Sequence, residues 1–515
     1  MSSNWPPGLP RSLDYPEVGA GAIALGAANR WGDRPAFIRA GETITFAELG
    51  SRAARFARGL LAGGVRPGDR VALRMPNCLE FPVAYYGTLL AGATFVPVNP
   101  LLPEAAAAAQ IADADAVRTI HAADVPRICD GHSDGPIDPP ATGLAHLAYT
   151  GGTTGDSKGV CLPHRNVVVN SLQYACWASG SLPDVDTDGG LTLDQVGSPE
   201  EWVTPLGEAV VVNLTPWFHA MGTIAGLNVL LLTGTTTVLH DRLDPAAYLA
   251  DAERLRITSM GGAPALFAAL LACPDIVRTD LSSVRLITSG AAPMPLEMIE
   301  RLRALAPEAV IAEGYGLTEV TMGATMTPTH RSGTHKPGAV GLPLFDTTVR
   351  IMSLDGDGPV ATGERGEVWI RGPQVMTGYH GRPDATADVL TDGWLRTGDI
   401  GILDADGYLS IVDRLKDMLL YKGYNVYPRE LEELLAAHPD VAAGAVVGRP
   451  DPAVGELPVA FVVPARAGVR ESDVLDDVNR QVVAYKRLRE IRFVSTIPVS
   501  AAGKILKREL RAQLD

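Results

Sequence analysis

Leu147-Ala-Tyr-Thr-Gly-Gly-Thr-Thr-Gly-Asp-Ser-Lys-Gly159 is the stretch from which the rest of the chain can be interpreted. The apolar run from Leu144 to Tyr149 predicts a strand, and a loop of glycine and threonine closed by Lys158 follows it. Glycines let consecutive backbone N–H groups surround an anion, threonine hydroxyls add donors, and the lysine adds a positive charge. The stretch therefore predicts a triphosphate site made of Thr150, Gly151, Gly152, Thr153, Thr154, Gly155 and Lys158.

Three other interpretations of this loop compete with a phosphate site. A flexible Gly/Ser/Thr linker has a similar composition. The Walker P-loop pattern fails, because Ser157 precedes Lys158 and Gly159 follows it. Gly155 to Gly159 formally matches the nucleophile elbow of hydrolases, but Ser157 lies several residues beyond the expected strand end. The linker is thus the alternative that the loop alone leaves open.

Length and composition limit the classes of protein that this chain can be. A chain of 515 residues is too long for one hydrophobic core, so two or more domains are expected. The formal net charge of −15 argues against a general binder of nucleic acids or anionic membranes. Lysine is scarce, with seven residues against 37 arginines, and four of the seven fall in the motifs described below.

The cysteines and the apolar segments predict a cytoplasmic protein without a transmembrane segment. The five cysteines are odd in number and scattered, which favours free thiols in a reducing compartment over disulfides or a zinc site. The Pro/Gly-rich start lacks the basic region and apolar run of a signal peptide. The longest apolar stretch, from Ile224 to Leu232, is too short to span a bilayer.

Strand and helix patterns alternate in the first part of the chain. Arg70 to Met75 predicts a strand, Leu79 to Ala91 a helix, and Thr94 to Val98 a second strand. This β-α-β order implies a parallel sheet and an α/β fold. Gly180 to Glu208 shows little periodicity and is expected to be a long loop.

Two further strands should bring loops to one edge of a sheet. Arg285 to Thr288 and Val310 to Ala312 predict strands on either side of a helix from Pro295 to Leu305. Ligands of open α/β sheets bind beyond the carboxyl ends of the strands. We therefore expect a binding site at the loops that follow, with the candidate residues Gly290, Ala291, Ala292, Gly314, Tyr315 and Gly316.

The phosphate loop resembles that of the adenylate-forming superfamily, which comprises acyl-CoA synthetases, adenylation domains of peptide synthetases and beetle luciferases. Its Tyr-Thr-Gly-Gly-Thr-Thr-Gly version is most similar to bacterial fatty acyl-CoA synthetases. Further stretches resemble the family's motifs in the family's order, so the resemblance covers about residues 30 to 510: Leu89–Pro100, Pro216–Gly222, Glu313–Glu319, Thr397–Asp399, Ile411–Asp417 and Pro498–Lys507.

The resemblance implies two domains. Residues 1–414 would form an N-terminal adenylation domain of several subdomains with parallel-rich sheets, which binds ATP and the carboxylate. Residues 415–515 would form a small, mobile α+β domain that carries the catalytic lysine. Helix Arg429 to Ala437, strands Ala442 to Val447 and Val459 to Val463, and helix Glu471 to Val483 are expected there.

The resemblance also implies roles in nucleotide binding. Tyr315 would stack on adenine, Thr318 would contact a phosphate, and Glu319 would bind Mg²⁺; an aromatic face, a hydroxyl and a carboxylate suit these tasks. Asp399 would bind the ribose with Arg414 nearby. By composition alone, Asp399 could equally be a solvated turn residue, and Thr318 and Glu319 could cap a turn.

Four more residues receive roles from the resemblance. Lys504 would be the catalytic lysine of adenylation, although its composition alone also suits a surface lysine. His219 would face the substrate pocket; taken alone it would more often be a core histidine. Lys416 would be the pivot that brings Gly423 to the thiol tunnel. No aspartate stands at His219, which argues against a free α-amino acid, and Leu420 replaces the lysine that luciferases use in oxidation.

The function implied is an ATP-dependent carboxylic acid–CoA ligase that forms an acyl-adenylate and then a thioester. ATP, Mg²⁺ and CoA would be required, and a medium- or long-chain fatty acid is the favoured substrate. The alternatives are activation of an aryl or specialised acid with a carrier-protein thiol or other nucleophile as acceptor, and a catalytically silent binding protein. We expect a monomer or homodimer and no nucleic-acid partner.

Overall fold

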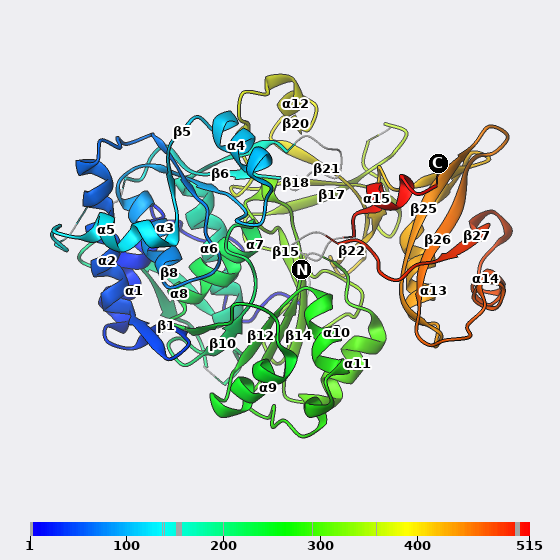
Figure 1. The fold of residues 1–515 in the computed structure, drawn as a ribbon, viewed down its shortest axis with the longest axis horizontal. Coiled ribbons are helices and arrows are strands. Elements are labelled where there is room, and N and C mark those ends of the chain that lie inside the picture. The colour runs from blue at the N-terminus through cyan, green and yellow to red at the C-terminus, as the bar shows by residue number, and fades with distance from the viewer. Residues whose placement is uncertain are drawn as a thin grey trace.

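The computed structural model describes residues 4–135, 137, 140–150, 157–198, 200–290, 292–356, 358–499 and 505–514. A large N-terminal part carries three sheets and a hairpin, and a smaller C-terminal part carries a sheet of its own (Figure 1). The fold is therefore the expected α/β architecture with a smaller α+β domain. The loop residues 151–156, together with Ala291 and Lys504, lie outside the described residues.

The two sheets that carry the phosphate loop and the central loops are parallel in their middle and antiparallel at an edge. The nine-stranded sheet has the order β16 (Leu342–Pro343), β15 (Thr325–Met326), β14 (Val310–Tyr315), β13 (Leu286–Ser289), β12 (Ser259–Gly262), β10 (Val210–Asn213), β11 (Thr236–Leu239), β1 (Pro35–Arg39) and β2 (Glu42–Thr45). The six-stranded sheet has the order β19 (Gly378–Tyr379), β7 (Gly159–Pro163), β6 (Leu144–Tyr149), β4 (Thr94–Pro97), β3 (Arg70–Leu73) and β5 (Ala116–Ile120).

The other two sheets flank the connection between the two parts of the chain. One contains β17 (Thr348–Met352), β18 (Arg365–Arg371), β20 (Leu390–Thr391), β21 (Trp394–Leu403) and β22 (Leu409–Arg414). The C-terminal sheet contains β23 (Leu419–Tyr421), β24 (Tyr424–Val426), β25 (Val441–Asp451), β26 (Gly455–Pro464) and β27 (Glu490–Phe493). Its helices are α13 (Pro428–Ala436), α14 (Glu471–Arg480) and α15 (Lys507–Arg511).

Most helices of the large part are amphipathic or buried. Helix α2 begins with a capping box, in which the Thr45 hydroxyl accepts from the N–H of Glu48 at 3.1 Å and the Glu48 carboxylate accepts from the N–H of Thr45 at 3.0 Å. The helices are α1 (Ala22–Trp31), α2 (Phe46–Ala62), α3 (Glu80–Leu90), α4 (Glu104–Asp113), α5 (Val125–Cys129), α6 (His164–Ser179), α7 (Ala220–Thr223), α8 (Leu230–Leu232), α9 (Pro245–Arg254), α10 (Pro264–Ala272), α11 (Leu296–Leu305) and α12 (Pro383–Ala387).

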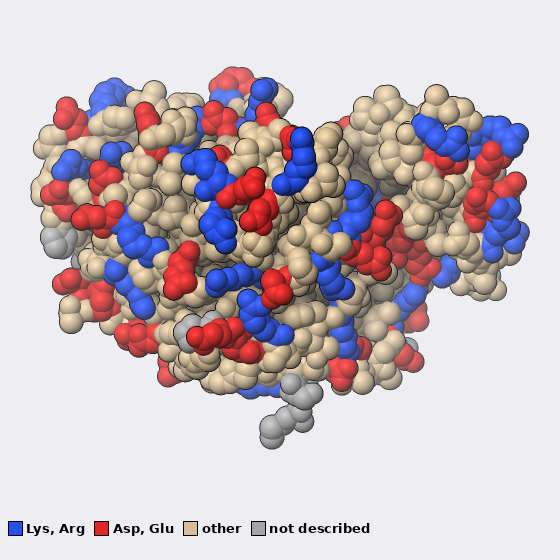
Figure 2. All heavy atoms as spheres, turned by 90° about the horizontal axis from the view of Figure 1, so that it is seen from below, with Lys and Arg blue, Asp and Glu red and all other residues tan. Residues whose placement is uncertain are grey.

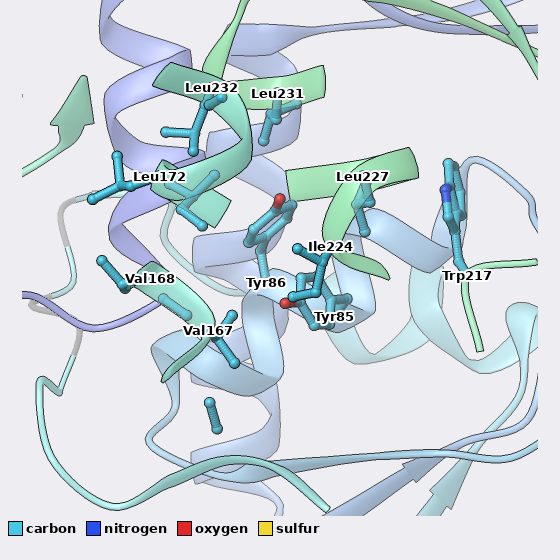
Figure 3. Close-up of a cluster of buried hydrophobic side chains, with 14 of the residues drawn as sticks. Tyr85, Tyr86, Val167, Val168, Leu172, Trp217, Ile224, Leu227, Leu231 and Leu232 are labelled. Carbon is cyan, nitrogen blue, oxygen red and sulfur yellow. The ribbon is translucent and has the colours of Figure 1, made fainter. Parts of the chain in front are cut away.

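Helices α3 and α6 are buried almost throughout; α3 is largely apolar, whereas α6 buries several polar side chains as well. Figure 3 shows them with a π-helix, Ile224–Val229, whose side chains gather around Tyr85 and Tyr86. The Gly226 carbonyl in the wide π turn accepts hydrogen bonds from Trp217 Nε1 at 2.9 Å and from Asn213 Nδ2 at 3.2 Å. The π-helix is therefore tied to the chain segment that leads to His219.

Two expected elements differ from the structure. Residues 180–208 contain a hairpin of β8 (Ser181–Val185) and β9 (Leu191–Gln195), so the expected loop is wrong there. The Asp186 carboxylate builds the turn by accepting from the N–H groups of Asp188 and Gly190. Strand β14 also runs on to Tyr315, because Gly314 and Tyr315 pair with β15.

The surface view in Figure 2 shows acidic and basic side chains interspersed over one face. On this face the two signs of charge lie close together (Figure 2), without a large patch of basic side chains alone. Among the residues that the structure describes, no helix is both long and apolar enough to cross a membrane.

Candidate active site

The phosphate-loop strand and its return strand form a closed hairpin base. The N–H of Thr150 donates to the Lys158 carbonyl at 3.0 Å, the N–H of Lys158 donates to Thr150 Oγ1 at 3.3 Å, and the Ser157 hydroxyl donates to the Thr150 carbonyl at 2.6 Å. The expected strand over Leu144–Tyr149 is confirmed as β6, and β7 returns antiparallel to it. Both ends of the glycine-rich loop are thus fixed side by side.

Lys158, Tyr379 and Glu319 form one cluster beside this hairpin. The Lys158 ammonium lies 4.8 Å from the centre of the Tyr379 ring, a cation–π distance. The Tyr379 hydroxyl donates a hydrogen bond of 2.8 Å to Glu319 Oε1. Burial, with the Glu319 charge next, raises the pKa of Tyr379, so its hydroxyl keeps its proton. The phosphate-loop lysine and the predicted metal ligand are therefore linked through one phenol ring.

Asp399, Tyr315 and Arg414 form a second cluster. The Tyr315 hydroxyl donates to Asp399 Oδ2 at 2.6 Å, and Arg414 Nε lies 3.1 Å from Asp399 Oδ1. The strand pairing of β21 with β22 places Asp399 opposite Arg414. Burial raises the pKa of Tyr315 well above its usual value, and the Asp399 charge adds to this. Asp399 is only 4 % exposed, and its carboxylate is held by the Tyr315 hydroxyl and the Arg414 guanidinium.

A cavity of about 260 Å³ opens beside this second cluster. Its lining contains Thr397, Gly398, Asp399, Arg414, Leu415 and Lys416. Lys416 is half-buried, and burial followed by the Arg414 charge lowers its pKa. The cavity thus combines a carboxylate with two cationic side chains, a suitable surround for a polar ligand with hydroxyl and phosphate groups.

Glycine is required at one position between the clusters. A Cβ at Gly316 would lie 2.0 Å from the Met322 carbonyl oxygen, so no larger residue fits without moving the backbone. At Gly314 the same atom would lie 3.1 Å from the Thr325 carbonyl oxygen, a tight contact. The backbone around Gly314 and Gly316 therefore packs closely against residues 322–325. This packing fixes the short segment that carries Tyr315 at one end and Glu319 at the other.

His219 lies outside both clusters, beside the Phe218 ring, at a ring-centre distance of 4.8 Å. His219 Nε2 is buried and, among the described residues, has no hydrogen-bond partner; burial lowers the pKa of this histidine, which favours the neutral ring. A Cβ at Gly290 would lie 2.9 Å from the Met221 sulfur. Ala292 is half-buried in the loop that follows Gly290. A buried polar ring nitrogen without a described partner makes His219 a candidate for contact with a bound small molecule.

Gly423 is positioned differently from the other predicted site residues. It forms, with Lys422, the two-residue turn between β23 and β24, and both residues have positive φ values of 81° and 51°. A Cβ at Gly423 would meet no atom within 4 Å. The described structure therefore leaves this turn in open space and brings Gly423 into neither cluster.

The oxygen donors of the first cluster suit Mg²⁺. Thr318 and Glu319 lie in one short 3-10 turn, and Glu319 Oε2 accepts no hydrogen bond from a described residue. Within the described ranges there is no group of three or more His, Cys, Asp or Glu side chains that could hold a metal alone. Mg²⁺ in nucleotide sites is commonly held by one or two carboxylates, water and the substrate phosphates, so this donor set fits the ion.

A larger hollow of about 540 Å³ lies elsewhere, lined by Arg55, Arg127 and neighbours. Arg55 pairs with Asp134 at 2.6 Å and Arg127 pairs with Asp124 at 2.8 Å. Because both arginines are already neutralised, this hollow is a weaker candidate for an anionic substrate than the two clusters.

One residue of the first cluster escaped sequence reasoning. Tyr379 lies 60 positions from Glu319, and no local pattern connects the two. Its only signal was its place in a glycine–tyrosine pair, which forms β19 and pairs with β7. The hydrogen bond between Tyr379 and Glu319 exists because the pairing of β19 with β7 places Tyr379 beside the return strand of the phosphate loop.

The fold and the clusters define the class of nucleotide-dependent ligating enzymes with a glycine-rich phosphate loop and a small second domain. The family model described as AMP-binding enzyme matches residues 26–380, and the model for the C-terminal domain of these enzymes matches residues 430–504. The chain belongs to the AMP-binding enzyme family, and the resemblance to the adenylate-forming superfamily is confirmed.

Individual relatives and solved structures match over nearly the whole chain. A feruloyl-CoA synthase from an Amycolatopsis species is 38% identical, covering 92% of this chain and 94% of the relative. A long-chain-fatty-acid–CoA ligase of Yersinia pestis is 34% identical, covering 98% and 96%. The crystal structure of ATP-bound MatB from Rhodopseudomonas palustris superposes with a TM-score of 0.84 at 29% identity, covering 96% and 99%.

Proposed function

We propose that this protein is an AMP-forming acid–CoA ligase. The observation that carries the proposal is the convergence of Lys158, Glu319 and Asp399, from three distant parts of the chain, on two clusters joined by the segment from Tyr315 to Glu319. The family membership, the acid–CoA ligases among its relatives and the ATP-bound structural neighbour support the same activity.

In the first step a carboxylate oxygen of the acid bonds to the α-phosphorus of ATP, and the bond to the bridging oxygen breaks to release pyrophosphate. Lys158 and the loop from Thr150 would hold the phosphates, and Lys504 would neutralise the developing charge. Thr318 would contact a phosphate. Glu319 would hold Mg²⁺, which when bound neutralises phosphate charge. These roles rest on the family resemblance and on the contacts described above.

The nucleoside would be held by the second cluster. Tyr315 offers an aromatic face, and Asp399 retains acceptor sites for ribose hydroxyls, because a carboxylate has about four lone-pair positions and two are used here. Arg414 would lie beside the ribose. The loop residues Gly290, Ala291, Ala292, Gly314 and Gly316 would border the nucleotide and the acid.

In the second step the CoA sulfur bonds to the acyl carbon, AMP leaves, and the thiol proton passes to solvent. We propose that residues 415–515 rotate about Lys416 between the steps and bring Gly423 to the thiol. The open surroundings of Gly423 in this structure support the proposal, since a residue that functions only after rotation has no partner beforehand. We place the domain boundary between residues 414 and 415, because β22 ends at Arg414, just before the proposed pivot.

The favoured substrate is a medium- or long-chain fatty acid, on the form of the phosphate loop and the likeness to the Yersinia pestis ligase. A second candidate is an aryl acid, which the greater identity to the feruloyl-CoA synthase favours. A carrier-protein thiol is the alternative acceptor. The five unpaired cysteines support a reducing, cytoplasmic location.

The test is pyrophosphate release with octanoate, palmitate, ferulate and benzoate, each with and without CoA. Release that depends on the acid, with a thioester formed when CoA is added, supports the proposal, and the best acid decides between the two substrate classes. Release without a CoA thioester would point to another acceptor. ATP binding without release for any acid would favour a silent binding protein.

A further inference from the structure

The segment that carries Tyr379 is bound on two sides to the predicted phosphate and metal site. On one side, the His380 N–H donates to the Gly159 carbonyl at 2.7 Å, directly after Lys158. On the other side, the Met376 N–H donates to the Glu319 carbonyl at 2.8 Å. The segment from Met376 to His380, which contains β19, therefore connects the exit of the phosphate loop with the turn that carries Glu319.

Tyr379 places its side chain between these two attachments. Its ring lies under the Lys158 ammonium at 4.8 Å, and its hydroxyl donates to Glu319 Oε1 at 2.8 Å. A carboxylate on a flexible side chain has several rotamers, and one short hydrogen bond to a fixed donor selects among them. Because Oε1 already accepts from the phenol, Oε2 is the oxygen with both acceptor positions left for a cation.

We propose that Tyr379 is a positioning residue that orients Glu319 for the metal–nucleotide complex while its ring holds Lys158 over the phosphates. The inference rests on the proposed function, because it assigns a task to the same site. Tyr379 touches neither substrate nor reacting atoms in this assignment and acts through its two neighbours.

The hydroxyl and the ring can be separated by substitution. Tyr379→Phe removes the hydrogen bond to Glu319 and keeps the ring under Lys158. Tyr379→Leu removes both. Tyr408→Phe is the control, because the Tyr408 hydroxyl likewise makes one bond, of 2.7 Å to the Thr334 carbonyl, and its ring likewise lies near a lysine, Lys336, without contact to Glu319 or Lys158.

The experiment measures Mn²⁺ binding by electron paramagnetic resonance in the presence of α,β-methylene-ATP, which cannot release pyrophosphate. We expect Tyr379→Phe to weaken Mn²⁺ binding about three- to tenfold, the range of one lost hydrogen bond, and Tyr408→Phe to stay within about twofold of wild type. Tyr379→Leu should in addition weaken binding of the nucleotide itself. The Mg²⁺ concentration for half-maximal pyrophosphate release should rise by the same factor in Tyr379→Phe.

The outcomes separate this inference from the proposed function. Equal Mn²⁺ affinity in wild type and Tyr379→Phe overturns the inference alone, as does a fall in turnover with an unchanged Mg²⁺ requirement, which a merely structural tyrosine would produce. A wild-type protein that binds no Mn²⁺–nucleotide complex overturns the proposed function and this inference together.

Discussion

Because the chain has few lysines, the substitution of a single lysine in the site is an informative test of its role. Lys504 is predicted to serve adenylation only, on its match to the family's mobile-domain lysine. In Lys504→Ala the rate of acid-dependent pyrophosphate release should fall by a large factor, because the variant lacks the positive charge that stabilises the transition state. The same variant should still convert supplied acyl-adenylate to thioester, which a single-turnover assay with CoA would measure. Equal loss of both steps would remove this assignment.

Cys161 tests whether the chemistry has a covalent step. It lies in β7 two residues beyond the phosphate-loop exit, and burial raises the pKa of its thiol, which keeps it protonated and poorly nucleophilic. Cys161→Ser should therefore leave turnover within a few-fold of wild type in the coupled pyrophosphate assay. A folded variant that binds ATP but has no activity would show that a thiol intermediate exists.

At the scale of elements, the connection between β22 and β23 decides whether the small domain can turn. The N–H groups of Asp417 and Met418 both donate to the Arg414 carbonyl, at 3.0 Å each, and the Leu415 N–H donates to the Gly398 carbonyl at 2.8 Å. These bonds close a compact turn around Lys416. A rotation of the following sheet has to change backbone angles within this short turn.

Lys416→Pro should trap one arrangement of the two domains. Proline fixes φ near −65° and restricts the residue before it, which is Leu415. If the resting form is competent for adenylation, acyl-adenylate should form and accumulate while thioester formation falls steeply. Single-turnover measurement of both steps on one preparation checks this. Thioester formation from supplied acyl-adenylate at the wild-type rate would contradict a rotating domain.

Elements whose signal is local were predictable from the sequence, and those formed by distant pairing were not. Strands β6 and β13 and helix α11 appear where continuous or periodic apolar residues indicated them. The hairpin of β8 and β9 was missed although its turn contains Gly189 and Gly190, because the Asp186 side chain that closes the turn leaves no periodic signal in the sequence. Tyr379 was missed for the corresponding reason in the site, since only the pairing of β19 with β7 brings it to Glu319.

At the scale of the whole molecule, ion pairs hold the small domain against the large one. Arg365 of β18 lies 2.7 Å from Glu430 of α13, and its guanidinium lies 5.0 Å from the Tyr427 ring centre. The backbone N–H of Arg429 also crosses the boundary and donates to the Asp413 carboxylate at 3.0 Å. Within the small domain, Lys486 pairs with Glu430 and Arg511 pairs with Asp417 at 2.7 Å. The contacts that cross the boundary favour the domain orientation seen here.

Arg365→Ala should shift the balance of domain orientations by a modest amount. An ion pair this exposed contributes about 0.2–1 kcal/mol, so the population ratio should change about 1.5- to fivefold. The readout is the inter-domain distance distribution from fluorescence energy transfer between dyes on the two domains. Arg39→Ala is the control, because its pair with Asp241 lies within the large domain. An identical shift in both variants, or none in Arg365→Ala, would contradict a role for this pair.

The π-helix has a consequence for how chain length can vary in this family. A π turn closes hydrogen bonds from i to i+5, so it holds one residue more than the α turn that would span the same rise. Loss of one residue from Ile224–Val229 would restore α geometry and leave the flanking residues in register, because the π turn holds the extra residue. The narrower turn would engage the Gly226 carbonyl in the helix's own hydrogen bonds, so this carbonyl would no longer accept from Trp217. We therefore expect a single-residue deletion here to keep the packing around Tyr85 and Tyr86 (Figure 3) but to loosen the segment that leads to His219.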